Sequence, residues 1–175
     1  MKKLKEYRIF FVALMGLLIL LLVNRAIGME ALRVTGFSLK EMATVIPPIF
    51  ILLGLLDVWV PREVMVRYMG EGSGLKGRIL AFALGSFAAG PLYGAFPVAA
   101  VFMKKGAKFS NIMIFIGAWS TTKIPMLLFE ISALGAPFAL TRLLVNIPGI
   151  LIIAYAVTRL ISEEEQKKIY AAFAE

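Results

Sequence analysis

Long apolar runs, separated by short polar stretches, make up most of the chain. Several uncharged runs approach or exceed the ~18–20 residues that cross a hydrocarbon core ~30 Å thick. The pattern predicts an all-α fold, a polytopic transmembrane helix bundle with about five spans. We expect these spans at about residues 7–23, 42–60, 78–103, 110–134 and 137–161, with a polar connection that carries Arg33, Lys40 and Glu41 between the first two.

The segments between the spans are more polar. The stretch "PREVMVRYM" starts with Pro61 at a plausible first helical position and separates apolar from charged residues, which predicts a short amphipathic helix in the interface. A glycine-rich stretch at 70–77 closes it, and the charged tail from Ser162 is predicted to be helical. No linker stands out, so residues 1–175 are expected to form a single transmembrane domain. The basic start "MKKLK" resembles a signal peptide, but no small-residue cleavage site follows promptly and a retained helix is favoured.

Composition excludes several classes of chemistry. The chain is 60% hydrophobic with a mean hydropathy of +0.85, and it contains neither cysteine nor histidine. This excludes a disulfide, a thiolate or imidazole metal site and Ser–His catalysis, so we expect no metal, no cofactor and no enzyme. The net charge of +8 indicates lysines and arginines at lipid headgroups, with the bilayer as partner and no nucleic acid.

The third apolar run contains helix breakers, although no charge occurs from Ile79 to Met103. In lipid every backbone polar group must be satisfied, and a broken helix persists only where protein or a wet cavity surrounds the break. Transporters use interrupted helices to direct free carbonyls at a solute. We therefore expect a broken or re-entrant helix at Gly90, Pro91, Gly94 and Pro97. The alternative is that the glycines serve close helix packing.

Ionisable residues inside apolar runs are the second signal. Lys123 lies between "FIGAWSTT" and "IPMLLF", and a lysine at the bilayer centre costs at least ~2.5–3.5 kcal/mol. Glu130 lies two turns later and shares a face with Lys123 unless Pro125 deflects the helix. Arg142 is within reach of Glu130 across a short hairpin, although snorkelling to the interface is favoured for it. The alternative function of this cluster is to hold the helices together.

Three hydroxyl residues precede Lys123: Ser120, Thr121 and Thr122. We expect them to donate hydrogen bonds to an anion or to line a wet path. A Ser–Lys pair also occurs in some hydrolases, but Ser120 with Lys123 is too generic a pair to favour an intramembrane hydrolase.

Two stretches carry a resemblance to a known family. The series "DVWVPREVMVRYMGEGSGLKGRILAFALGS", followed by "GPLYGAFPVAAVFMKKGAKFSNIMIFIGAWSTTKIPML", resembles the predicted permease family of ArsP- and YraQ-like membrane proteins. The shared order is an interfacial "P-x-E" helix, a glycine-rich loop, a segment with "P-V-A-A", a basic "K-K-G-A" loop and a span with Ser/Thr and Pro. The match covers about residues 57–149. It implies a permease and, in the arsenic-handling branch, export of organoarsenicals.

Two departures from that family matter. Many relatives carry a cysteine pair before "P-V-A-A", where this chain has "GPLYGAFP", so a natural ligand for a soft metalloid is missing. The chain also has about half the usual family length, which by analogy predicts a homodimer. With five spans, the two sides of the membrane would carry eight and nine lysines and arginines, a balance that suggests antiparallel pairing. This last argument holds only if the third run crosses the membrane once.

Together these observations predict a multi-pass permease subunit in the cell membrane that moves a small polar or anionic solute. The expected pathway residues are Gly90, Pro91, Gly94, Pro97, Ser120, Thr121, Thr122, Lys123, Pro125 and Glu130. The alternative is a non-transporting membrane scaffold or an assembly subunit of a larger complex.

Overall fold

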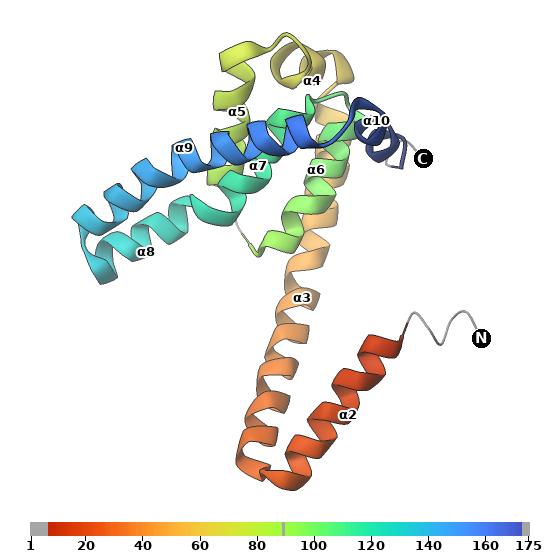
Figure 1. Cartoon of the computed structure of the whole chain (residues 1–175), viewed down its shortest axis with the longest axis vertical. Coiled ribbons are helices and arrows are strands. Elements are labelled where there is room, and N and C mark those ends of the chain that lie inside the picture. Colours follow the sequence, from red (N-terminus) through yellow and green to blue (C-terminus); the bar gives the residue numbers. More distant parts are fainter. Residues whose placement is uncertain (1–6, 89, 173–175) are drawn as a thin grey trace. The chain divides into compact units, whose positions relative to one another are not determined.

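The computed structural model describes residues 7–88 and 90–172, with the backbone only at 53, 56 and 57. All regular structure in these residues is helical (Figure 1), which confirms the all-α part of the predicted fold class. The elements are α2 (Arg8–Val23), α3 (Arg25–Trp59), α4 (Arg62–Met69), α5 (Gly74–Phe87), the 3₁₀ turn η1 (Leu92–Gly94), α6 (Ala95–Lys104), α7 (Phe109–Thr121), α8 (Ile124–Leu134), α9 (Ala136–Leu160) and α10 (Glu163–Ala172).

The chain forms two compact units, one ending at Pro48 and the other starting at Ile49. The first unit is a helical hairpin of α2 and the first part of α3, with Asn24 in an extended conformation at the turn. The Asn24 side chain accepts a hydrogen bond from the Ile27 backbone N–H at 3.2 Å and so caps α3. The sequence predicts a polar connection between the first two spans, and this prediction is wrong. Arg33, Lys40 and Glu41 lie inside the continuous helix α3. An ion pair at 2.7 Å between Arg33 and Glu30, one turn apart, forms within that stretch.

Within residues 7–88 and 90–172, three segments are long and apolar enough to cross a membrane: Arg25–Leu52, Phe109–Leu134 and Ala136–Leu160. The apolar helices Arg8–Val23 and Leu92–Lys104 are shorter. The predicted number of five spans is therefore not confirmed. The main difference from the prediction lies in the third apolar run, residues 78–103.

That third run is a helical hairpin (Figure 1). The chain descends through α5, which ends at Phe87, and returns in the opposite direction through η1 and α6. Its two ends lie together, since the Lys108 backbone N–H donates to the Met69 carbonyl at 2.7 Å and the Lys108 ammonium pairs with Glu71 at 2.8 Å. With 14 and 10 residues, α5 and α6 are only about 21 and 15 Å long, so neither crosses ~30 Å of hydrocarbon.

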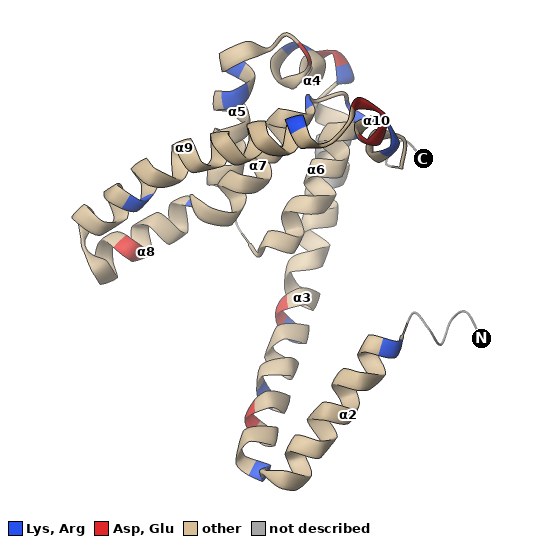
Figure 2. Ribbon diagram, viewed as in Figure 1, with Lys and Arg blue, Asp and Glu red and all other residues tan. Residues whose placement is uncertain are grey.

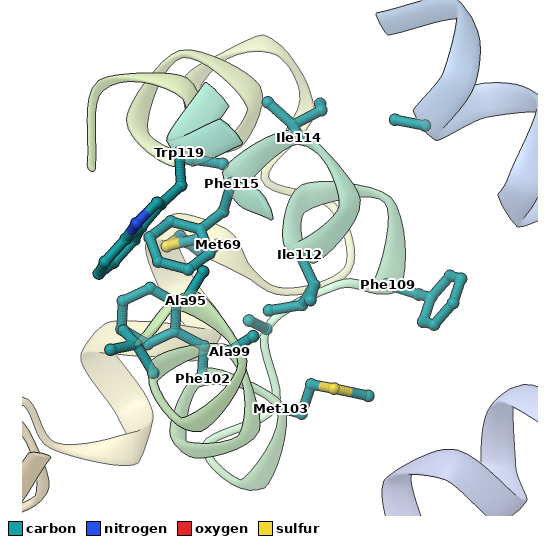
Figure 3. Packing of buried hydrophobic residues seen from close by; sticks show 14 of the residues in the cluster. Met69, Ala95, Ala99, Phe102, Met103, Phe109, Ile112, Ile114, Phe115 and Trp119 are labelled. Atoms are coloured by element: carbon teal, nitrogen blue, oxygen red, sulfur yellow. The ribbon is translucent and has the colours of Figure 1, made fainter. Parts of the chain in front are cut away.

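The core of the second unit surrounds α7 (Figure 3). Phe115 contacts Phe102 of α6 and Trp119 in edge-on geometry, with ring centroids 5.1 and 5.5 Å apart. α5 lies close against α7 because Gly85 has no side chain: a Cβ there would overlap the Phe115 carbonyl oxygen. In contrast to this core, α8 and α9 expose large apolar side chains, as expected for helices in lipid. Examples are Leu128, Phe129, Leu144, Val145 and Ile152.

Positive charge gathers at one end of the second unit (Figure 2). Residues 49–175 contain twelve lysines and arginines. All but two lie on α4, the start of α5, the end of α6 and the loop after it, the end of α9 or α10; we call this the basic end. Its ten members are Arg62, Arg67, Lys76, Arg78, Lys104, Lys105, Lys108, Arg159, Lys167 and Lys168. The near-equal numbers of cations on the two sides of the membrane are expected only if the third run crosses the membrane once. Because this run turns back, that expectation does not hold, and the argument for antiparallel pairing loses its basis.

Candidate functional site

Two helix breaks meet in the second unit. The tip of the α5–α6 hairpin has Gly90 at φ +101°, a conformation that favours glycine. The Lys123 ammonium, at the break between α7 and α8, donates to the Gly90 carbonyl at 2.8 Å. The Trp119 indole N–H, one turn earlier in α7, donates to the Pro91 carbonyl at 3.2 Å and more weakly to Gly90 at 3.4 Å. Lys123 and the end of α7 therefore hold the hairpin tip through two backbone carbonyls.

Pro125 explains why α7 does not continue directly into α8. Proline has no backbone N–H, so the carbonyl four residues earlier, that of Thr121, receives no helical hydrogen bond from it. A guanidinium N–H of Arg142 donates to that carbonyl at 2.7 Å. An arginine from α9 thus satisfies a backbone group that the proline leaves free, which an apolar interior requires.

The same arginine pairs with the glutamate of α8. Arg142 Nε lies 2.8 Å from Glu130 Oε2, and the side chains are 27% and 7% exposed. The prediction that Arg142 snorkels is wrong, because its guanidinium is held between Glu130 and the Thr121 carbonyl. Lys123 and Glu130 also take different partners, with the lysine bound to the hairpin tip and the glutamate to α9.

The hydroxyls before Lys123 bond to their own helix. Ser120 and Thr121 both donate to the Gly117 carbonyl, at 2.8 and 2.9 Å. Thr122 donates to the Ala118 carbonyl at 3.0 Å, and since a hydroxyl has one hydrogen, Ser86 of α5 donates in turn to Thr122 at 3.0 Å. In this conformation the three residues offer lone pairs, and the donors at the break include the other N–H bonds of Lys123.

The remaining predicted residues lie around the hairpin tip. Gly94 is buried in η1, where an added Cβ would lie 3.6 Å from the Trp119 ring. Pro97 occupies the first turn of α6, where a missing N–H costs no helical bond. The structure thus brings Gly90, Pro91 and Lys123 into one cluster and adds Trp119.

Sequence reasoning missed two members of the site. Trp119 precedes the Ser/Thr run directly, and its indole donor could have been considered as a partner for a broken backbone. Ser86 lies near the end of an apolar run and carries no signal that distinguishes it from a packing residue.

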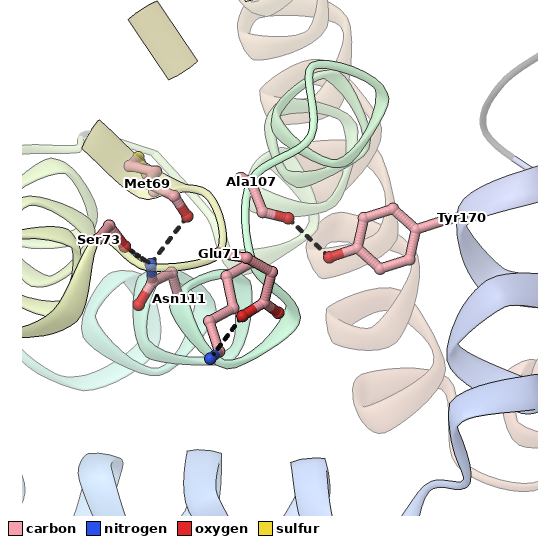
Figure 4. Close-up of polar contacts among 7 residues, drawn as sticks. Met69, Glu71, Ser73, Ala107, Asn111 and Tyr170 are labelled. Atoms are coloured by element: carbon pink, nitrogen blue, oxygen red, sulfur yellow. Dashed lines mark hydrogen bonds and ion pairs between the residues drawn. The ribbon is translucent and has the colours of Figure 1, made fainter. Parts of the chain in front are cut away.

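A second polar cluster holds the basic end together (Figure 4). The Asn111 amide donates to the Met69 carbonyl at 2.8 Å and to the Ser73 hydroxyl at 3.1 Å. Tyr170 of α10 donates to the Ala107 carbonyl at 2.6 Å. Burial, and secondarily the negative charge of Glu71, raises the pKa of Tyr170 to about 12. These bonds fix the two ends of the hairpin and dock α10 onto them.

Two cavities of the second unit lie at the basic end, and neither is lined by Gly90 or Lys123. One, of about 300 Å³, is bounded by the α6–α7 loop and α10 and includes Glu71 and Tyr170. The other, of about 310 Å³, lies between α5, α7 and α9. Among the described residues, no three acidic, histidine or cysteine side chains are grouped so as to hold a metal ion.

Helical segments of membrane-spanning length, with lipid-type apolar surfaces and a broken helix pair inside, define a helical membrane protein. The chain belongs to the ArsP-type family of predicted permeases, which it matches over residues 28–175. This confirms the resemblance inferred from the sequence and extends it on both sides of residues 57–149. No curated protein and no solved structure matches the chain.

Proposed function

We propose that the chain is a subunit of a permease in the cell membrane, and that it moves a small polar or anionic solute past the contact between Gly90 and Lys123. The observation that carries the proposal is the hydrogen bond from the Lys123 ammonium to the Gly90 carbonyl, which joins two helix breaks. Interrupted helices whose free backbone groups face each other are the usual construction of a solute site in transporters.

The charge at this contact favours an anion. The Gly90 carbonyl is neutral, and the carboxylate of Glu130 is engaged by Arg142. Lys123, Glu130 and Arg142 together therefore carry one uncompensated positive charge. An ammonium has three N–H donors, of which Gly90 takes one, so two remain for a solute. Such a charge at membrane depth is costly unless it meets a counter-charge, and a bound anion would supply one.

Passage requires the contact to open. An anion that binds Lys123 competes with the Gly90 carbonyl, and its binding would free the hairpin tip to move. The Pro91 carbonyl stays bound to Trp119, so the movement would be a rotation about that point. The driving force would come from a solute gradient or a separate subunit.

We also propose that two copies of the chain assemble. The hairpin α5–α6 reaches only part of the bilayer thickness, so one copy provides half of a path bounded by broken helices. A homodimer would provide a second hairpin.

Two observations favour a membrane scaffold as the second candidate function. The close α5–α7 contact at Gly85 and the internal hydrogen bonds of the Ser/Thr residues are also what tight static packing requires. In that case Lys123 serves only to hold the hairpin tip.

Solute flux separates the two functions. The purified chain is reconstituted in liposomes, and uptake of labelled acetate, phosphate and sulfate is compared with that of protein-free liposomes. We expect uptake of at least one anion, reduced about ten-fold or more in Lys123→Met, since hydrogen bonds to a charged group are worth about 1.5–3 kcal/mol and about 1.4 kcal/mol corresponds to ten-fold. Lys76→Met removes an exposed lysine at the basic end and should leave the flux unchanged. Protein-free rates for all three anions, or equal flux in Lys123→Met, would favour the scaffold.

A further inference from the structure

The cavity between α5, α7 and α9 combines cations with apolar walls. Arg78 from α5, Lys108 from the loop before α7 and Arg159 from the last turn of α9 line it. Ile114 and Leu151 form part of its apolar wall. With about 310 Å³ it lies at the lower limit of ligand-binding cavities in proteins.

Two of the three cations of this cavity, Arg78 and Arg159, are not neutralised by the described residues. Lys108 pairs with Glu71 at 2.8 Å. Arg159 lies over the Tyr155 ring at 5.3 Å, an interaction that leaves its charge in place, and within residues 7–88 and 90–172 neither Arg78 nor Arg159 has a carboxylate partner. Two guanidinium groups from different helices therefore face one space without a counter-charge, although guanidinium groups are suited to bidentate binding of phosphate.

Two further features favour an anion at this place. α7 begins at Phe109, so the positive end of its dipole lies beside the cavity. The Ser110 hydroxyl also lines the cavity and has no hydrogen-bond partner in the part of the chain that the structure describes. It can donate to an oxygen atom of a bound group.

We propose that this cavity holds the phosphate group of an anionic phospholipid. The cations and the polar loops of the basic end lie where headgroups are expected, while Ile114 and Leu151 offer a surface for the start of an acyl chain. A free phosphate ion would use the same guanidinium groups but would gain nothing from the apolar wall. Basic pockets between membrane helices are a recurrent form of lipid headgroup site. The site is separate from the Gly90–Lys123 contact and does not depend on the proposed transport.

Native mass spectrometry of the full chain in detergent tests this assignment. The protein is titrated with phosphatidylglycerol, with phosphatidylcholine and with inorganic phosphate. We expect one phosphatidylglycerol to be retained at concentrations where phosphatidylcholine is not. Arg78→Gln/Arg159→Gln should bind it about twenty-five-fold more weakly, since each cation near an anionic lipid contributes roughly five-fold.

A matched control removes two cations of the basic end that do not line the cavity, in Arg62→Gln/Arg67→Gln, and should bind as the wild type does. Equal loss in both double variants would mean diffuse attraction to the surface and would overturn the proposal. Inorganic phosphate that binds as tightly as phosphatidylglycerol would overturn the lipid assignment. If the first double variant does not fold, the single variant Arg159→Gln should still show a five-fold loss, and its absence would count equally against the site.

Discussion

The contact between α5 and α7 makes a quantitative prediction at Gly85. An alanine Cβ at this position would overlap the Phe115 carbonyl oxygen and would lie 2.7 Å from the Ala118 Cβ and 3.0 Å from the Trp119 backbone nitrogen. Two of these atoms belong to the backbone of α7 and cannot rotate away. Gly85→Ala therefore forces the two helices apart.

The size of the effect follows from two opposing contributions. Overpacking a close contact typically costs about 1–3 kcal/mol, while alanine is favoured over glycine in a helix by about 1 kcal/mol. Since backbone atoms must move, we expect a net loss of about 1–2 kcal/mol. Gly149 is the control, because it lies inside α9 and a Cβ there would meet no atom of the described residues within 4 Å. Gly149→Ala should be neutral or stabilising by up to about 1 kcal/mol.

The assay is reversible unfolding in mixed micelles by titration with sodium dodecyl sulfate, followed by tryptophan fluorescence. Trp119 lies directly at the altered contact, so the folded-state spectrum of Gly85→Ala should also change. Equal stability of the two alanine variants would refute the close packing of α5 on α7, and with it the position of the hairpin tip.

Three further predictions concern the ion pairs, the tyrosine and the orientation. Glu130→Gln leaves the partly buried guanidinium of Arg142 without its carboxylate and should cost about 3 kcal/mol. Glu71→Gln, at a more exposed pair, should cost at most about 1 kcal/mol, and equal costs in the same unfolding assay would contradict this difference in burial. Tyr170 has a folded-state pKa of about 12, above the unfolded value of about 10. Its contribution to stability is therefore complete below pH 10 and lost as the pH rises towards 12, and ultraviolet difference spectra against Tyr170→Phe should show a phenolate midpoint near 12 rather than 10. The positive-inside rule predicts that the basic end faces the cytoplasm. In this cysteine-free chain a thiol reagent that cannot cross the membrane should therefore label Ala136→Cys from outside the cell but not Lys167→Cys, and the reverse pattern would contradict that orientation.

The sequence predicts the helix breaks well because their cause is local. Glycine and proline at residues 90–97, and Pro125 after Lys123, disrupt backbone bonding whatever the tertiary structure. The direction in which the chain leaves the first break is not local. It depends on contacts such as that between Met69 and Lys108, which lie 39 positions apart (108 − 69). A straight span and a hairpin have the same apolar pattern.

The partners of charged residues could not be predicted for the same reason. Whether Arg142 snorkels or binds Glu130 depends on how α9 is rotated against α8, and spacing along the chain fixes only that the two are within reach. The charged residues around Arg33 predict a connection between two spans, but charge alone does not end a helix. The stretch contains no proline and forms a Glu30–Arg33 pair one turn apart, which a continuous helix allows.

The central claim is that the run from α5 to α6 returns to the end where it began, so that its tip reaches Lys123. Crosslinking between Glu71→Cys and Lys108→Cys tests this directly, because the wild-type side chains are 2.8 Å apart and the chain has no other cysteine. A short bifunctional thiol reagent should join the two residues within one chain, and it should not join Glu71→Cys to Ala136→Cys. If the run crossed the membrane once, the first pair would lie on opposite sides of ~30 Å of hydrocarbon, and the absence of that crosslink in a folded protein would contradict the hairpin.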